Sequence, residues 1–129
     1  WRGYLTPTTQ REWCCKKKKF KTKLMSERPD LWEAFEEFRD LYFPHFDFSG
    51  VQLNYNYALG PHKDANNVGE SVLVCTGDYT GGSTCVELED GVVQKFDARL
   101  RPVCFDGSKY THWVEDFTGD RFSVVFFRD

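Results

Sequence analysis

The chain has 129 residues, of which 40% are hydrophobic and 17% aromatic, and its formal net charge at pH 7 is −3. This composition predicts one folded domain over residues 1–129 and excludes a disordered chain, while the negative charge gives no overall attraction to nucleic acid. No run in the sequence approaches the ~18 consecutive apolar residues of a membrane helix, so we expect no membrane partner.

Residues 1–25 form a lead-in without clear hydrophobic periodicity, which we expect to be irregular or partly strand-forming. It carries a basic patch between Lys16 and Lys23, with the sequence "KKKKFK" at 16–21. A lysine that neutralises a phosphate releases counterions, so such a patch can bind nucleic acid even on an acidic domain. The alternative is a solvated surface segment.

The five cysteines contain no C-x-x-C pair, which disfavours a zinc ribbon. Cys14 and Cys15 are adjacent, whereas Cys75, Cys85 and Cys104 lie within or beside apolar runs. We interpret them as reduced thiols that pack as small hydrophobic groups. Reduced thiols indicate an intracellular location, in the cytoplasm or the nucleus.

One amphipathic helix is predicted over residues 26–43, where apolar side chains recur at helical spacing. Ser26 or Asp30 can cap its start, Pro29 suits its first turn, and Pro44 ends it. We expect the helix to cover a hydrophobic sheet face. The apolar side chains predicted to face that sheet are Leu31, Phe35, Phe38 and Tyr42.

Beyond Pro44 the sequence consists of short β-rich runs separated by turn residues, including "YTGGS", "EDG" and "TGD". The pattern predicts a mainly β fold with one supporting helix, as a sandwich or a jelly-roll core over residues 51–129. The predicted strands are 51–58, 71–77, 83–89, 92–98, 101–106, 112–117 and 121–129.

A metal site is suggested by His62 and Asp64, which are two residues apart and so point to one face of an extended segment. A third ligand has to come from His45 or His112, and we favour His112 because it opens a predicted strand. Two histidines and one carboxylate on one face of a metal, with other positions open, are typical of non-haem iron(II) oxygenases. The open positions would accept a 2-oxo acid and dioxygen.

A 2-oxo acid also needs a partner for its distant carboxylate. Arg121 begins the last predicted strand, and a guanidinium pairs with a carboxylate through two parallel hydrogen bonds. Ser123 lies two residues further on and offers a hydroxyl to the same group. Each of these residues is common by itself, and it is their order along β-rich segments that favours a site.

The motifs "HKD" at 62–64, His112 and "RFS" at 121–123 resemble those of the iron(II)/2-oxoglutarate-dependent dioxygenase superfamily, whose fold is a double-stranded β-helix (jelly roll). The segment "HKDANNVGESVLVCTGDYTGG" is similar to the TET/JBP branch, which oxidises the methyl group of 5-methylcytosine or thymine in nucleic acid. The resemblance implies Fe(II), 2-oxoglutarate and O2 as cofactor and co-substrates. It implies His62, Asp64 and His112 as the iron ligands and catalytic centre.

The resemblance also implies roles for residues around the motifs. Arg121 and Ser123 would hold 2-oxoglutarate, with Asn54 and Tyr57 as further candidates, although "NYNY" also fits a strand with its tyrosines in the core. The residues predicted to contact the substrate are Asn67, Asn66 and Trp113. For the asparagines the alternative is turn formation, and for the tryptophan it is burial.

Two other functions remain open on the sequence. The same chemistry could hydroxylate a protein side chain, as in prolyl hydroxylases, or a small molecule, because nothing in the metal motif restricts the substrate. A non-catalytic jelly-roll module that only binds is the third alternative, and the complete ligand set argues against it.

Overall fold

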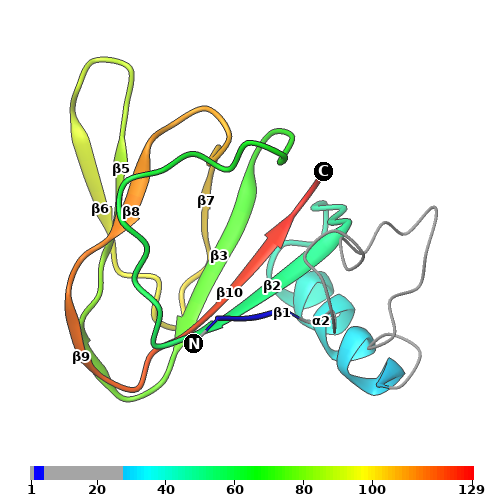
Figure 1. Ribbon diagram of the computed structural model, residues 1–129. Coiled ribbons are helices and arrows are strands. Elements are labelled where there is room, and N and C mark those ends of the chain that lie inside the picture. Colours follow the sequence, from blue (N-terminus) through cyan, green and yellow to red (C-terminus); the bar gives the residue numbers. More distant parts are fainter. Residues whose placement is uncertain (1, 5–27) are drawn as a thin grey trace.

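The computed structural model describes residues 2–4 and 28–129. Figure 1 shows them in three layers: a helix, a large sheet and a group of smaller sheets. In this part of the chain the structure is mainly β with a single helix, which confirms the predicted fold class. The elements are β1 (Arg2–Tyr4), α2 (Pro29–Tyr42), β2 (Gly50–Tyr55), β3 (Ser71–Thr76), β4 (Tyr79–Gly81), β5 (Thr84–Glu87), β6 (Val93–Phe96), β7 (Val103–Phe105), β8 (His112–Val114), β9 (Phe117–Gly119) and β10 (Phe122–Phe127).

The basic patch between Lys16 and Lys23, the adjacent cysteines and the predicted cap Ser26 lie outside the described residues. Helix α2 begins at Pro29, as predicted. Its cap residue is Arg28, which makes no capping side-chain bond and instead pairs with Asp30, so the predicted cap at Asp30 is wrong. The helix is too short and too polar to cross a membrane.

The apolar face of α2 differs from the prediction at its two ends. Trp32 is the helix residue that is fully buried, and its ring lies 5.3 Å from that of Phe48. Tyr42 is 61% exposed, so the prediction that it faces the sheet is wrong. It occupies the last position of the helix, and among the described aromatic residues its ring pairs only with that of Phe38.

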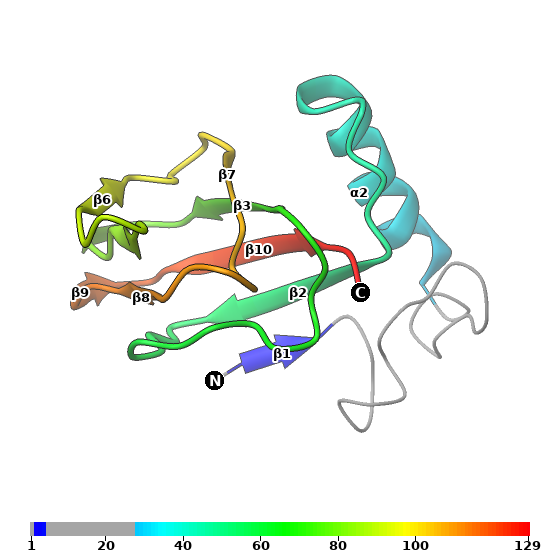
Figure 2. The same cartoon turned by 90° about the horizontal axis from the view of Figure 1, so that it is seen from above.

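The five-stranded sheet has the order β1-β2-β10-β3-β7, and its central pairs are antiparallel. Because successive side chains of a strand point to opposite faces, each strand contributes to two cores. Val51, Val74 and Phe126 pack toward α2, whereas Leu73 and Val125 pack on the other face. That second face, here called the inner face, looks toward the smaller sheets (Figure 2).

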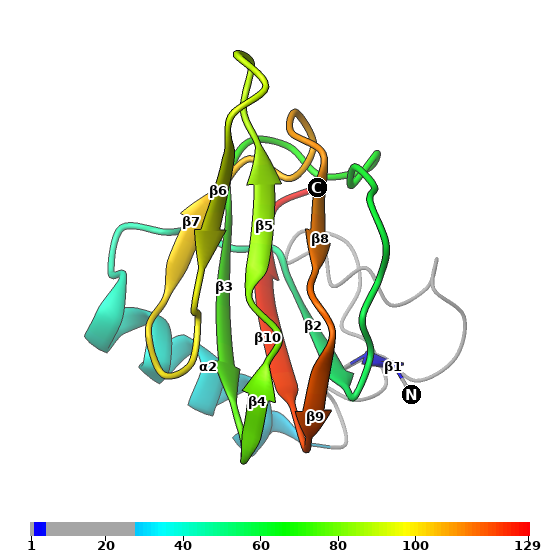
Figure 3. The ribbon, with the colours of Figure 1, turned by 90° about the vertical axis from the view of Figure 1, so that its left-hand side faces the viewer.

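The smaller sheets form one bent antiparallel ribbon, in which β4 pairs with β9 and β5 pairs with β8 (Figure 3). Strands β4 and β9 occupy sequence that we predicted as turns, "YTGGS" and "TGD", and those two predictions are wrong. Tyr79 pairs with Gly119 and Gly81 with Phe117, so the turn residues are used to bend a paired ribbon instead of closing a hairpin. Glycines at positive φ permit this bend.

The cysteines of the described residues are free, and two of the three follow the prediction. Cys75 and Cys85 are buried, whereas Cys104 is exposed and does not pack as a hydrophobic group. Cys104 lies on the edge strand β7, and its thiol donates to a carboxylate oxygen of Glu70 at 3.1 Å.

We predict that Cys104 reacts slowly with alkylating agents although it is exposed. Partial burial of its sulfur and the hydrogen bond to Glu70 raise the pKa of the Cys104 thiol to about 12, which removes the reactive thiolate near neutral pH. Peptide mapping after iodoacetamide treatment measures the rate. Replacement Glu70→Gln removes the negative charge, and labelling of Cys104 should become roughly tenfold faster; an unchanged rate would contradict this account.

Candidate metal centre

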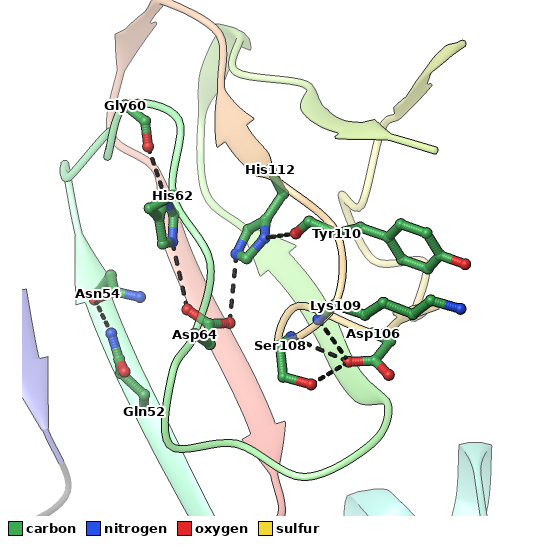
Figure 4. Close-up of polar contacts among 10 residues, drawn as sticks. All are labelled: Gln52, Asn54, Gly60, His62, Asp64, Asp106, Ser108, Lys109, Tyr110 and His112. Atoms are coloured by element: carbon green, nitrogen blue, oxygen red, sulfur yellow. Dashed lines mark hydrogen bonds and ion pairs between the residues drawn. The ribbon is translucent and has the colours of Figure 1, made fainter. Parts of the chain in front are cut away.

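Three side chains from two distant parts of the chain converge on one point, and they are the three predicted ligands. One ligand atom from each of His62, Asp64 and His112 lies within 4.8 Å of the other two. The two carboxylate oxygens of Asp64 lie 3.4 Å from His62 Nε2 and 3.3 Å from His112 Nε2 (Figure 4). His45, the alternative histidine, is exposed after the helix and is not part of this group.

Backbone pairing brings the ligands together. The segment that follows β2 crosses to the ribbon and forms an antiparallel bridge with β8, in which His62 and His112 exchange both backbone hydrogen bonds. The backbone N–H of Asp64 donates to the carbonyl of Gly107 at 2.8 Å. His112 is buried, and His62 and Asp64 are partly buried, so the ligand cluster lies at the edge of the space between the sheets.

Both imidazole rings are held in one tautomer by backbone carbonyls. His62 Nδ1 donates to the Gly60 carbonyl at 2.7 Å, and His112 Nδ1 donates to the Tyr110 carbonyl at 3.0 Å. A carbonyl oxygen can only accept, so in the neutral ring the Nε2 atom carries the lone pair. Two lone pairs and a carboxylate then face one another, an arrangement that needs either protons or a cation between them.

Protonation equilibria agree with this geometry. Burial alone would favour the neutral carboxyl of Asp64, but hydrogen bonds from His112 and His62 outweigh it and hold the pKa of Asp64 well below its usual range. The hydrogen bond to Asp64 raises the pKa of His62 against the opposing effect of burial. The cluster thus stabilises positive charge at its centre, and a divalent cation would replace the protons.

Arg121 is a buried cation without a carboxylate partner among the described residues. It immediately precedes β10, is 3% exposed, and has an Nε atom that makes no hydrogen bond with the described chain. Its Nη2 atom donates to the sulfur of Cys75 at 3.2 Å, and its guanidinium lies over the rings of Tyr79 and Phe117. A buried guanidinium that lacks an anion is a candidate binding site for one.

Ser123 and Asn54 lie beside Arg121 on the inner face. The sheet register pairs Ser123 with Asn54 on one side and with Cys75 on the other. The amide of Asn54 donates to the hydroxyl of Ser123 at 3.1 Å and accepts from Gln52 at 3.0 Å. Ser123 therefore shares a face with Arg121, as predicted, and Asn54 and Gln52 extend the polar row on that face. Tyr57 lies beyond the end of β2 and is partly buried.

Asn56 contacts Arg121 and was missed by the sequence analysis. Its side-chain oxygen accepts from the backbone N–H of Arg121 at 2.8 Å, and its own backbone N–H donates to the Arg121 carbonyl at 2.8 Å. Asn56 has a φ of 49°, a left-handed conformation that asparagine tolerates better than most residues. The repeated "NYNY" run conceals this role, because only the backbone conformation distinguishes Asn56 from Asn54.

We predict that Asn56→Gly weakens binding of 2-oxoglutarate about fivefold and leaves metal affinity unchanged. Glycine keeps the left-handed backbone, so the change removes the side-chain hydrogen bond to the Arg121 backbone, worth about 1 kcal/mol, together with a longer one to Asp120. Tyr55→Phe is the matched control, since it removes another hydrogen bond to Asp120 without touching Arg121. Calorimetric titration measures both affinities, and an equal loss in the control would contradict the role of Asn56.

Two of the predicted substrate residues, Asn66 and Asn67, lie in the turn that follows the ligand Asp64. Asn66 and Asn67 follow Asp64 in a turn closed by a hydrogen bond from the backbone N–H of Asn67 to the Asp64 carbonyl, and neither has a positive φ. The turn therefore does not use the left-handed tolerance of asparagine. Asn66 is exposed and Asn67 is partly buried.

Trp113 lies on the opposite face of β8 from His112, because adjacent side chains of a strand point to opposite sides. Its strand partner is Cys85 on β5, whereas His112 pairs with Val86. This placement gives no support to the prediction that Trp113 walls the site beside the ligand. Sequence adjacency to His112 suggested the contact, and strand alternation removes it.

No protein-family model matches the chain, and no curated protein does. Solved structures do match. One is an oxidoreductase of the 2OG-Fe(II) oxygenase family from Burkholderia pseudomallei, with 23% identity and a TM-score of 0.55 over 70% of this chain and 48% of that one. Another is NgTET1 in complex with 5mC DNA, with 19% identity and a TM-score of 0.56 over 84% of this chain and 55% of that one. A third is a Pseudomonas putida prolyl-4-hydroxylase, with 18% identity and a TM-score of 0.50 over 63% of this chain and 53% of that one.

These similarities identify the fold as the double-stranded β-helix of 2-oxoglutarate oxygenases, as predicted. The chain spans about half the length of the solved structures that it matches. The same fold thus occurs in proteins whose names refer to DNA and to prolyl residues.

Proposed function

We propose that the chain is the core of an Fe(II)- and 2-oxoglutarate-dependent dioxygenase. The observation that carries the proposal is the convergence of two lone pairs and one carboxylate from His62, Asp64 and His112. Two imidazoles and one carboxylate are the donor set of non-haem iron(II) oxygenases, and it leaves other metal positions open. The double-stranded β-helix fold supports the same conclusion.

The residues on the inner face fit 2-oxoglutarate. Arg121 is buried with an unpartnered Nε atom, so a carboxylate would satisfy a donor that the described chain leaves without an acceptor. The hydroxyl of Ser123, which already accepts from Asn54, can donate to the same carboxylate. Arg121, Ser123 and Asn54 would orient the co-substrate, with Tyr57 as a further candidate.

Bound iron(II) would supply the activation of dioxygen, with 2-oxoglutarate as the source of electrons. The protein contributes the geometry around it. The carbonyls of Gly60 and Tyr110 fix the two imidazoles with Nε2 toward the centre, and Asp64 neutralises one positive charge. Burial of His112 and Arg121 keeps water from competing for these contacts.

For the substrate we propose a methyl group of a modified pyrimidine, 5-methylcytosine or thymine, in nucleic acid. Asn67 supports this proposal, because it follows the ligand Asp64 in a turn that does not require asparagine. Its amide makes no hydrogen bond with the described residues, and an amide reads the edge of a base through one donor and one acceptor. The TET structure of the same fold is a complex with 5mC DNA.

The test is a substrate panel with Fe(II) and 2-oxoglutarate, read by mass spectrometry and by succinate release. The panel holds oligonucleotides with 5-methylcytosine, thymine or unmethylated cytosine, and proline-containing peptides. We expect a gain of one oxygen on methylated oligonucleotides and none with Asp64→Ala. Oxidation of peptides alone would replace the substrate proposal by the protein-hydroxylase alternative. Absence of succinate with every substrate, in a protein that binds 2-oxoglutarate, would favour a binding module.

Asn67 gives a sharper test of the substrate class. Asn67→Ala should reduce oxidation of methylated oligonucleotides at least tenfold and leave metal and 2-oxoglutarate affinities unchanged, since its side chain contacts neither group of proposed ligands. Asn66→Ala is the matched control one residue away, on the exposed side of the turn. Equal activity of both variants and the wild-type protein would exclude a base contact by Asn67.

A further inference from the structure

The loop between β7 and β8 contacts two of the three candidate metal ligands, Asp64 and His112. The Gly107 carbonyl accepts from the backbone N–H of Asp64, and the Tyr110 carbonyl accepts from His112 Nδ1. The loop is held in shape by Asp106, whose side chain accepts from the backbone N–H groups of Ser108 and Lys109 (Figure 4). A fixed loop therefore orients two of the three ligands from one side.

Gly107 is the residue of this loop that lies against the ligands. A Cβ atom on Gly107 would be 2.5 Å from Asp64 Oδ2, a distance that ordinary packing does not allow, and 3.0 Å from His112 Cε1, which is a tight contact. The oxygen concerned is the one that faces His112 Nε2. Any side chain at position 107 would thus occupy the space that the Asp64 carboxylate needs in order to meet His112.

Backbone conformation does not explain a glycine at this position. Several described glycines have a positive φ, which favours glycine over other residues, but Gly107 does not. Alanine is therefore compatible with the backbone of Gly107, and the only conflict is with the ligands. The cheapest way to relieve it is rotation of the Asp64 carboxylate, because this group is the free end of a side chain.

We propose that Gly107 is a positioning residue of the metal centre, kept without a side chain so that the Asp64 carboxylate can lie between the two histidines. The inference rests on the proposed function, since it concerns affinity for the proposed metal. It adds a residue with no ligand atom of its own to the set that determines metal binding. A substitution at this position should reduce metal affinity with little effect on the fold.

The experiment compares Gly107→Ala with Gly50→Ala, a matched control outside the metal centre. Gly50 also lacks a positive φ, and a Cβ atom there would meet the ring of Phe127. Calorimetric titration with Mn(II), as a stable substitute for Fe(II), measures the affinity of the full chain. We expect affinity to fall about tenfold to a hundredfold for Gly107→Ala, as for other changes that disturb ligand orientation, and to stay within about twofold for Gly50→Ala.

The outcomes separate this inference from the proposed function. Equal Mn(II) affinity of Gly107→Ala and wild type would overturn the role of Gly107 and leave the metal centre intact. A wild-type protein that does not bind Mn(II), Fe(II) or Co(II) would overturn both.

A second variant covers the case in which Gly107→Ala folds poorly. In the double variant Asp64→Ala and Gly107→Ala the carboxylate that collides is gone, so most of the loss in melting temperature caused by Gly107→Ala should disappear. A loss of the same size in the Asp64→Ala background would show that the collision is with something else, and it would overturn the inference.

Discussion

Replacement of Asp64 by alanine is expected to abolish metal binding and the turnover of 2-oxoglutarate while the domain remains folded. Asp64 contributes the only carboxylate of the cluster, and both histidines face it through Nε2. Loss of a direct ligand should reduce metal affinity by more than about a hundredfold, which is the upper range for changes outside the ligand shell. Titration with Mn(II) and measurement of succinate release give the two readouts.

The fold should survive this change, because the backbone contacts of both histidines remain. Without Asp64 the largest cause that raises the pKa of His62 is gone, and both rings keep their hydrogen bonds to the Gly60 and Tyr110 carbonyls. Lys63→Ala is the matched control, since Lys63 lies between the ligands in sequence but is exposed. Iron-dependent turnover retained by Asp64→Ala would rule out the proposed ligand set.

Replacement of Arg121 by alanine should raise the KM for 2-oxoglutarate about thirtyfold or more and leave metal affinity unchanged. Truncation of one partner of a buried charge pair costs about 2 kcal/mol or more, which is the origin of this figure. Arg121→Lys should recover only part of the loss, because an ammonium keeps the charge but cannot donate through two parallel bonds. Steady-state kinetics with varied 2-oxoglutarate measure the effect.

Arg99 provides the control for Arg121, because its guanidinium stacks on the same Tyr79 ring at 3.9 Å from the ring centre while the residue itself is exposed. If Arg99→Ala raised the KM as much as Arg121→Ala, the effect would be transmitted through Tyr79 and not through a contact with the co-substrate. Loss of Mn(II) binding in Arg121→Ala would instead show that Arg121 supports the metal centre.

The sequence was sufficient for the features that depend on residue type and alternation. Strand β2 alternates apolar and polar residues, whereas β3 and β10 contain continuous apolar runs, as a sheet with two covered faces requires. These short β-rich runs, and the helical spacing before them, were enough to predict the mainly β fold and its single described helix. The metal cluster followed from the side chains that such chemistry needs, combined with the spacing of His62 and Asp64. The strands and the helix are local features of the sequence. The third metal ligand was not local, but only His45 and His112 were available as candidates.

The features that were wrong or missed depend on tertiary contacts. Strands β4 and β9 stabilise each other only because the ribbon bends, and glycine-rich sequence gives no sign of that pairing. Tyr42 has the periodicity of a buried residue but is exposed at the last position of the helix. Gly107 looked like an ordinary loop glycine, because its closeness to Asp64 and His112 exists only in three dimensions.

The bridge between His62 and His112 joins segments that are far apart in the chain, and this separation links metal binding to folding kinetics. Ligand atoms from these two distant segments meet only after the intervening loops have closed, and long-range closure slows folding of β-rich domains. A bound ion would therefore stabilise the native topology as a whole, by an amount that grows with the logarithm of its free concentration. The metal supply would then influence how long the folded domain persists, in addition to whether it is active.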